Sequence, residues 1–130
     1  MSKKNYDVYI PDGHKVTKAE REAAWILADH YRKSVQFLRP SNQYMTRTAD
    51  FIINDIKFEL KSPTSIKIKN VKKSIYLASE QSPNIVVDMR KTKISEDRMI
   101  NICETFVKNS KKLNKILLIV NKKKIIDFSK

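Results

Sequence analysis

The segment Ala49-Asp-Phe-Ile-Ile-Asn-Asp-Ile-Lys-Phe-Glu-Leu-Lys61 consists of two short apolar runs separated by Asn54-Asp55. Asn and Asp adopt the left-handed backbone of a tight two-residue turn more readily than most residues, so the segment predicts a β-hairpin. Ser62-Pro63 follows the second run, and proline cannot continue a sheet ladder. We therefore expect two antiparallel strands, 49–53 and 56–61, with the turn between them.

Charged side chains alternate with apolar ones along the second predicted strand. This alternation places Glu59 and Lys61 on one face of the sheet and turns their apolar neighbours toward the core. Pairing within the hairpin brings Asp50, on the first strand, close to Glu59. Two carboxylates so placed repel each other unless a divalent cation or a proton lies between them.

A cation between these carboxylates would be Mg²⁺ or Mn²⁺, because ligand sets made of oxygen alone suit hard ions. Such an ion polarises a phosphodiester and delivers a hydroxide. Lys61 would then orient or deprotonate the attacking water, or neutralise charge in the transition state. The alternative is a cross-strand salt bridge on a solvated face of the sheet, with no catalytic role.

The chain on both sides of the hairpin reads as alternating helices and strands. Thr17-Lys-Ala-Glu20 is a capping box that begins a helix running to about residue 33, and residues 34–38 form a strand. After the hairpin, the pattern predicts in order a helix that carries Val71, Ile75 and Ala78, a strand at 85–87, a helix capped by Ser95, a strand at 116–120 and an edge strand at 125–128. We expect an N-terminal arm at 1–16 and one domain at 17–130, with helices packed against a mixed sheet.

The composition is strongly basic. Lys and Arg number 27 against 14 Asp and Glu, which gives a formal net charge of +13 over 130 residues. A surplus of this size draws a small domain toward phosphate backbones, although lysine is also a common solvated surface residue. The single cysteine, Cys103, has no partner for an internal disulfide and fits a reducing compartment. The sequence shows no signal peptide and no membrane-spanning run, so we expect a cytoplasmic site of action and no membrane partner.

The order of these elements and their charged residues has a counterpart among known nucleases. Asp50 followed by Glu59-Leu60-Lys61, inside an αβββαβ order, resembles the PD-(D/E)xK nuclease superfamily, although Ala49 stands where the fullest pattern has proline. Over about residues 17–120, the chain more closely resembles the C-terminal tRNase domain of contact-dependent growth inhibition (Cdi) toxins, which also occurs in phage and mobile-element proteins. The stretches that carry this resemblance are Glu20-x-x-Ala-Ala-x-x-Leu-Ala, Val35-x-Phe-Leu, Thr48-Ala-Asp-Phe, Phe58-Glu-Leu-Lys-Ser-Pro-Thr64 and Gln81-Ser-Pro-Asn-Ile-Val-Val-Asp88.

The resemblance implies a fold, an activity and a set of site residues. The fold is an α/β restriction-endonuclease-like αβββαβ core, its mixed central sheet flanked by helices, with an extra C-terminal helix and strands. The activity is metal-dependent cleavage of RNA phosphodiesters, with tRNA favoured over DNA, by a toxin or mobile-element effector. Its producer would need an immunity protein or tight control of expression. Asp50 and Glu59 match the metal-binding acids and Lys61 the catalytic lysine. Glu20 matches an additional acid beside the metal, and Gln81 a helical glutamine near the active site.

Several of these residues also have structural explanations. Glu20 completes the capping box, and Gln81 fits the polar end of a helix. Ser62 and Thr64 either contact phosphate or cap the turn around the intervening proline. The lysines that begin the next helix would flank the site and track a phosphate backbone. They are Lys67, Lys69, Lys72 and Lys73.

Other functions remain compatible with the same residues. A DNA endonuclease of the junction-resolvase or restriction kind would use the same active site, since an enzyme that cuts the backbone reads geometry and flanking contacts. A non-catalytic nucleic-acid-binding domain would keep the charged residues of the hairpin only as surface pairs. A metal-independent RNase would need His14 or His30 as its acid or base.

Overall fold

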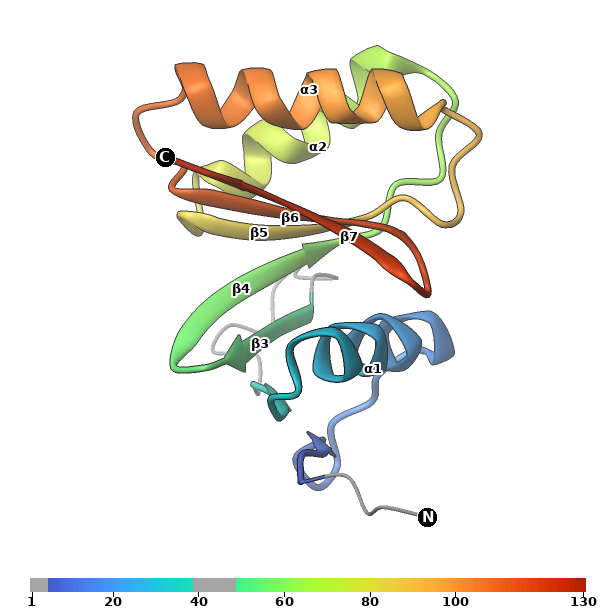
Figure 1. Cartoon of the computed structure of the whole chain (residues 1–130), viewed down its shortest axis with the longest axis vertical. Helices are drawn as coiled ribbons and strands as arrows, with labels where there is room; N and C mark the ends of the chain where they lie inside the picture. The colour runs from blue at the N-terminus through green and yellow to red at the C-terminus, as the bar shows by residue number, and fades with distance from the viewer. Residues whose placement is uncertain (1–4, 39–48) are drawn as a thin grey trace.

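The strands of the central sheet lie side by side in the order in which they occur in the chain. The computed structural model describes residues 5–38 and 49–130, and this part of the chain forms a seven-stranded sheet and three helices (Figure 1). The elements are β1 (Val8–Tyr9), α1 (Lys18–Tyr31), β2 (Val35–Phe37), β3 (Ala49–Ile53), β4 (Ile56–Lys61), α2 (Ile68–Ser79), β5 (Asn84–Asp88), α3 (Glu96–Asn109), β6 (Lys115–Asn121) and β7 (Lys124–Ser129).

The sheet combines antiparallel and parallel pairing. β2, β3 and β4 form an antiparallel meander, whereas β4, β5 and β6 run parallel to one another. Parallel neighbours require a crossover connection, and α2 and α3 provide the two crossovers. β7 returns antiparallel beside β6 and closes that edge of the sheet, as the sequence predicted.

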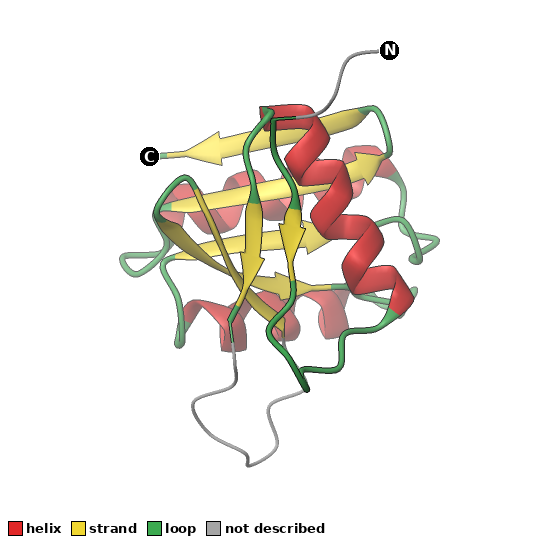
Figure 2. Cartoon of the chain, turned by 90° about the horizontal axis from the view of Figure 1, so that it is seen from below, coloured by secondary structure: helices red, strands yellow, loops and turns green. Residues whose placement is uncertain are grey.

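Helices cover both faces of the sheet and create two separate cores. α1 packs on one face and buries Ala24 and Leu27 against Phe51 and Phe58. α2 and α3 pack on the opposite face, as the layers in Figure 1 show. Figure 2 looks onto the face that α1 crosses, with the other two helices behind the sheet. Because successive side chains of a strand point to opposite faces, alternate residues face either α1 or the α2–α3 pair.

Local sequence signals explain where the elements begin and turn. The capping box is present: Glu20 N donates to Thr17 Oγ1 over 3.0 Å, and Thr17 N donates to Glu20 Oε1 over 2.8 Å. Ser95 accepts a hydrogen bond from the backbone of the first turn of α3, as predicted. Asn54 and Asp55 adopt φ angles of 51° and 68°, the left-handed turn that the β3–β4 hairpin requires.

The N-terminal segment forms a strand, as the structure alone shows, and α3 buries one face. Val8 and Tyr9 form a short strand that pairs in parallel with β2, so the predicted arm contributes one edge of the sheet. In α3, Val107 is buried and Phe106 is only half-buried. Thr48, part of the resemblance, lies outside the described residues. Within the described ranges, the helices lack the length and hydropathy that a membrane span needs.

Candidate active site

Asp50 and Glu59 lie directly opposite each other in the β3–β4 ladder. The next pair, Phe51 and Phe58, is buried on the α1 face, so the two carboxylates point to the face covered by α2. Glu59 also lies beside Ile85 of β5, whose side chain belongs to the α2–α3 core. The predicted approach of the two carboxylates is confirmed.

Both carboxylates keep an oxygen with unused hydrogen-bonding capacity. Asp50 Oδ1 and Glu59 Oε2 are buried and accept no hydrogen bond from any described residue. The Glu59 side chain is nearly inaccessible, with 2% of the residue exposed, whereas Asp50 is half-buried. Because a buried acceptor without a partner is unfavourable, this arrangement favours a bound proton or cation. Glu59 forms an ion pair with Lys61, as the alternative expected, but on a covered face of the sheet and not on a solvated one.

Two lysines flank the carboxylates on the same face. Lys61 Nζ lies 3.9 Å from Glu59 Oε2, and Lys57 Nζ lies 3.8 Å from Asp50 Oδ2. Both distances are within ion-pair range and beyond hydrogen-bond length, so neither ammonium satisfies the unpaired oxygens. The sequence analysis missed Lys57, although the alternation that linked Glu59 to Lys61 also places Lys57 on their face.

The electrostatics of the pair follow from its burial. Desolvation raises the pKa of Glu59, the ammonium of Lys61 lowers it in part, and the charge of Asp50 raises it further. Desolvation also raises the pKa of Asp50, against the opposing effect of Lys57 and, to a smaller extent, Lys61. Burial outweighs the lysines in both cases. The two carboxylates therefore hold a proton more strongly than exposed acids do, in the absence of a cation.

A polar cleft of about 300 Å³ opens where β4 ends. It lies between the N-terminal turn of α1 and the segment that leads into α2. Its lining includes Thr17, Glu20, Lys61, Ser62, Thr64 and Lys91. The structure thus brings the predicted phosphate-binding residues Ser62 and Thr64 beside Lys61.

Lys91 and Ser74 are cleft residues that the sequence analysis missed. Lys91 follows β5, which runs parallel to β4, and parallel strands end at the same edge of a sheet. That rule provides a signal for Lys91 once the pairing of β5 with β4 is known. Ser74 reaches the cleft from α2, and only the docking of this helix reveals its position.

Glu20 shares the cleft with Lys61 but does not join the two hairpin carboxylates. Its Oε1 accepts the backbone hydrogen bond from Thr17 that completes the capping box. In residues 5–38 and 49–130, no group of three His, Cys, Asp or Glu side chains is close enough to hold a metal ion. Capping of α1 therefore explains the hydrogen bond that Glu20 is observed to make.

Gln81 lies apart from the rest of the predicted site. It is exposed in the turn between α2 and β5. Lys61 lies beside Val87, near the C-terminal end of β5. Gln81 precedes β5, so it lies at the opposite end of this strand, away from Lys61. The structure places Gln81 at the polar end of a helix, the alternative that the sequence also allowed.

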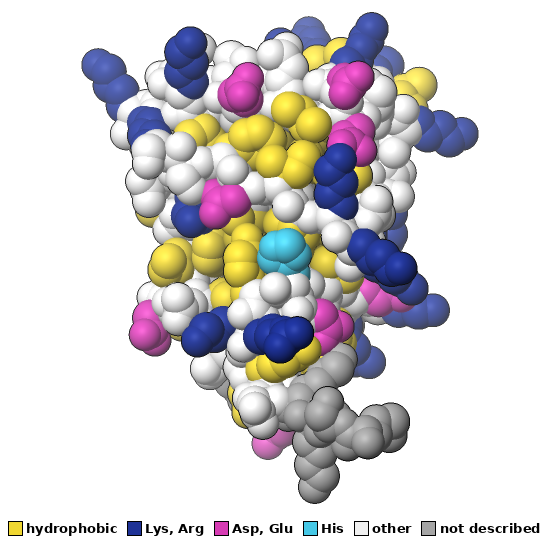
Figure 3. Space-filling view, in the orientation of Figure 1, with side chains coloured by type: hydrophobic (Ala, Val, Ile, Leu, Met, Phe, Trp, Pro, Cys, Tyr) yellow, Lys and Arg dark blue, Asp and Glu magenta, His cyan; other side chains and the backbone are white. Residues whose placement is uncertain are grey.

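The remaining predicted contacts lie beside the cleft or away from it. The predicted lysines of the α2 start (Lys67, Lys69, Lys72 and Lys73) are exposed, on the helix that sends Ser74 into the cleft. On the face shown in Figure 3, Lys and Arg side chains are spread apart, with acidic side chains between them. His14 lies against Phe37 and His30 against Tyr31, and neither lines the cleft.

The fold has a counterpart among solved structures. It matches, with a TM-score of 0.65 and 18% sequence identity, a chain of the CdiA-CT/CdiI toxin and immunity complex from Burkholderia pseudomallei. The match covers 95% of this chain and 99% of that chain. This similarity confirms the predicted α/β fold class. No curated protein gives a significant match to the sequence.

The family follows from the sequence itself. Residues 47–125 match the family described as the contact-dependent growth inhibition CdiA C-terminal domain. This chain belongs to that family, and it is a toxin domain. The predicted relationship to Cdi toxins is confirmed.

Proposed function

We propose that this toxin domain is a metal-dependent endonuclease of the PD-(D/E)xK superfamily that cleaves RNA, with tRNA as its preferred substrate. The observation that carries the proposal is the pairing of Asp50 with Glu59, each with a buried oxygen that accepts no hydrogen bond from the described residues. Lys61 lies beside this pair and also lines the polar cleft. Asp50 and Glu59 do not themselves line the cleft, so Lys61 is the residue that connects the acid pair with it at the end of β4.

The donor set suits a hard divalent cation. Mg²⁺ is commonly held by one or two carboxylates, with water or substrate phosphate completing its coordination, and Mn²⁺ accepts similar oxygen ligands. Asp50 and Glu59 would hold such an ion without Glu20, whose side chain caps α1. When bound, the ion would polarise the scissile phosphate and lower the pKa of a coordinated water.

The protein side chains would bind and orient the substrate. Lys61 is half-exposed at the cleft, where its ammonium would neutralise charge that develops on the phosphate. The hydroxyls of Ser62 and Thr64 and the ammonium of Lys91 line the same cleft and would bind neighbouring phosphates. The exposed lysines at the start of α2 would extend this path along the backbone.

The family and the charge support a substrate class, a partner and a compartment for this proposal. A toxin domain with a net charge of +13 is suited to a polyanionic target, and the resemblance favours tRNA, which is found in the cytoplasm. The similar solved structure is a toxin and immunity complex. We propose that an immunity protein likewise binds and neutralises this chain in the cell that makes it.

A cleavage assay tests the activity and its site together. Purified protein is incubated with total tRNA, duplex DNA and branched DNA, in Mg²⁺, Mn²⁺ or EDTA. We expect tRNA cleavage that requires the metal and falls about a thousandfold in Asp50→Asn and Lys61→Met, as removal of transition-state stabilisation does elsewhere. Asp97→Asn and Lys108→Met change exposed charges on α3 and serve as matched controls that retain activity.

Each other outcome has a definite meaning. Metal-dependent cleavage of DNA alone would move the protein to the resolvase or restriction class with the same residues. Cleavage in EDTA that is insensitive to Asp50→Asn would overturn the assigned site. Binding of tRNA without any cleavage would favour the non-catalytic alternative.

A further inference from the structure

A second cavity lies on the face of the sheet that α1 covers, at the opposite end of β4 from the cleft. It has a volume of about 170 Å³ and lies between the end of α1, the β3–β4 turn and strands β6 and β7. Ile56, the first residue of β4, lines this cavity, whereas Lys61, the last residue of β4, lines the cleft. At 3.4 Å per residue the two sites are about 17 Å apart along the strand.

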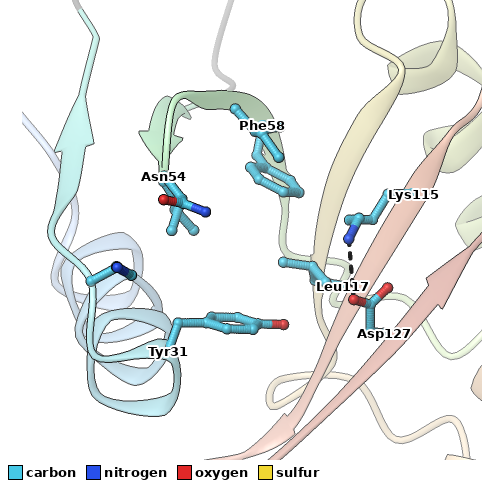
Figure 4. Close-up of a pocket in the computed structure, with 9 residues that line it drawn as sticks. Tyr31, Asn54, Phe58, Lys115, Leu117 and Asp127 are labelled. Atoms are coloured by element: carbon cyan, nitrogen blue, oxygen red, sulfur yellow. Dashed lines mark hydrogen bonds and ion pairs between the residues drawn. The ribbon is translucent and has the colours of Figure 1, made fainter.

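The walls of the cavity suit a flat ring. Figure 4 shows the rings of Tyr31 and Phe58 on different sides of the space, with Leu117 at a third side between them. Pockets for drug-sized ligands have volumes of about 300–1,000 Å³, so this smaller cavity fits a single ring system. Burial, and to a smaller extent the charge of Asp127, raises the pKa of Tyr31, so its hydroxyl remains protonated and can donate a hydrogen bond.

One side of the cavity presents a donor and an acceptor next to each other. Lys115 Nζ donates to Asp127 Oδ2 over 3.2 Å, across the β6–β7 ladder (Figure 4). Ser129 Oγ donates to the other carboxylate oxygen of Asp127. A carboxylate has about four acceptor positions, so Asp127 can accept further hydrogen bonds from a ligand. Lys33 also lines the cavity and adds a positive charge.

We propose that this cavity binds a nucleobase, and guanine in preference to the others. Guanine is flat and carries a carbonyl acceptor beside two adjacent N–H donor groups on one edge. Lys115 matches the carbonyl, and Asp127 matches the two donors. The aromatic side chains of Tyr31 and Phe58 contact the ring, a mode of binding that every base permits. Lys33 would contact the phosphate of the same nucleotide. The site is independent of the proposed cleavage.

Titration of the ¹⁵N-labelled protein with mononucleotides, followed by NMR in EDTA, tests this site without any cleavage. We expect GMP to shift the amide signals of residues around the cavity, Tyr31, Phe58 and Leu117 among them. GMP should bind about fivefold or more tightly than IMP, which lacks the second donor, and than AMP, as one lost polar contact to a base requires. Ribose 5-phosphate should leave these signals unchanged.

Two variants test whether binding depends on hydrogen bonds from Asp127 to the base or only on the shape of the cavity. Asp127→Asn should weaken GMP about fivefold and remove the preference over IMP, because an amide cannot accept both donors. Tyr31→Phe keeps the ring and should retain most of the binding. Asp97→Asn is the matched control for the loss of a surface carboxylate. Shifts that ribose 5-phosphate reproduces, equal affinity for GMP, IMP and AMP, or shifts confined to the Lys61 cleft would each overturn the proposal.

A second arm distinguishes a free nucleotide from a guanosine within RNA. An RNA hairpin with one unpaired guanosine is compared with the same hairpin carrying inosine. Shifts at the cavity that depend on guanosine would identify an RNA residue as the ligand, and cavity shifts with GMP alone would identify a free nucleotide. Asp50→Asn should leave both results unchanged, so failure of the nuclease proposal would not affect them.

Discussion

Asp50 and Glu59 face each other across the β3–β4 hairpin, and one oxygen of each is buried without a hydrogen-bond donor from the described residues. For the unbound protein this relationship is unfavourable, since burial raises the pKa of both carboxyls and each negative charge opposes the other. The proposed divalent cation would offset this cost by binding between the two acids. Sites built for function are commonly less stable than they could be.

Glu59→Gln should therefore stabilise the protein near neutral pH, by roughly 0.5–2 kcal/mol. The folded-state pKa of Glu59 is raised above its unfolded value, so its contribution is fully present below about pH 4.3 and is lost as the pH rises through the folded pKa. Glutamine carries no charge and avoids that loss. Urea unfolding in EDTA between pH 4 and 8 should show a gain that vanishes at the acidic end.

The exposed Glu104→Gln on α3 is the control for this series and should follow the wild type at every pH. A Glu59→Gln protein that is less stable than the wild type at pH 7.5 would show that the ionised carboxylate is satisfied in the fold. It would remove the physical argument for a cation between the two acids.

Divalent cations should raise the unfolding temperature of the wild type. A ligand that binds only the folded state at ten times its Kd contributes about 1.4 kcal/mol. Asp50→Asn combined with Glu59→Gln should remove this increase, and EDTA should reverse it. Lys61→Met should retain the increase because it removes a positive charge near the ion, which separates metal binding from catalysis. Differential scanning fluorimetry with Mg²⁺ and Mn²⁺ measures the effect, and an equal rise in the double variant would contradict the assigned ligands.

Local patterns predicted the hairpin and the approach of its carboxylates well. Strand alternation depends only on neighbouring residues, and the Asn54-Asp55 turn fixes the register that places Asp50 opposite Glu59. The capping box likewise needs only the residues from Thr17 to Glu20, and it is present as predicted. These features were accessible because each is determined within a few residues.

The rest of the site depends on contacts between distant parts of the chain. The burial of Glu59 arises because α2 crosses the sheet, and no pattern inside β4 reports this crossing. Lys91 enters the cleft through the parallel pairing of β5 with β4. The parallel direction of β5 also determines which end of α2 is near Lys61, and it places Gln81 at the end of the strands away from Lys61.

Arg90 should be required for stability, because it holds α1 onto the end of β5. Its Nε and Nη2 donate to the two oxygens of Asp88 over 2.9 and 2.8 Å, and Nη2 also donates to Ala19 O over 3.2 Å. Asp88 is buried, with 1% of the residue exposed. Arg90→Gln leaves that carboxylate without its cation, and we expect a loss of about 3 kcal/mol in urea unfolding.

Lys112→Gln is the matched control, because Lys112 pairs with Glu80 on the exposed surface. Its unfolding midpoint should remain close to that of the wild type, as is usual for exposed pairs. Equal effects of the two substitutions would mean that Arg90 acts only as a surface residue. The N-terminal turn of α1, and with it one wall of the cleft, would then have another anchor.

The two lysines beside the carboxylates should differ in their effect on cleavage. Lys61 lines the cleft, whereas Lys57 is not among its lining residues and has a side chain that is 54% exposed. A lysine that contacts the reacting phosphate stabilises charge that develops only in the transition state, so Lys61→Met should lower kcat with little change in KM. Lys57→Met removes a cation that lowers the pKa of Asp50 and, to a smaller extent, that of Glu59. It should alter kcat by less than about tenfold and shift the acidic limb of the pH–rate profile to higher pH. Single-turnover cleavage of tRNA between pH 5 and 9 measures both effects. Equal losses in the two variants would show that the ammonium groups act through the field around the carboxylates, without a specific contact from Lys61.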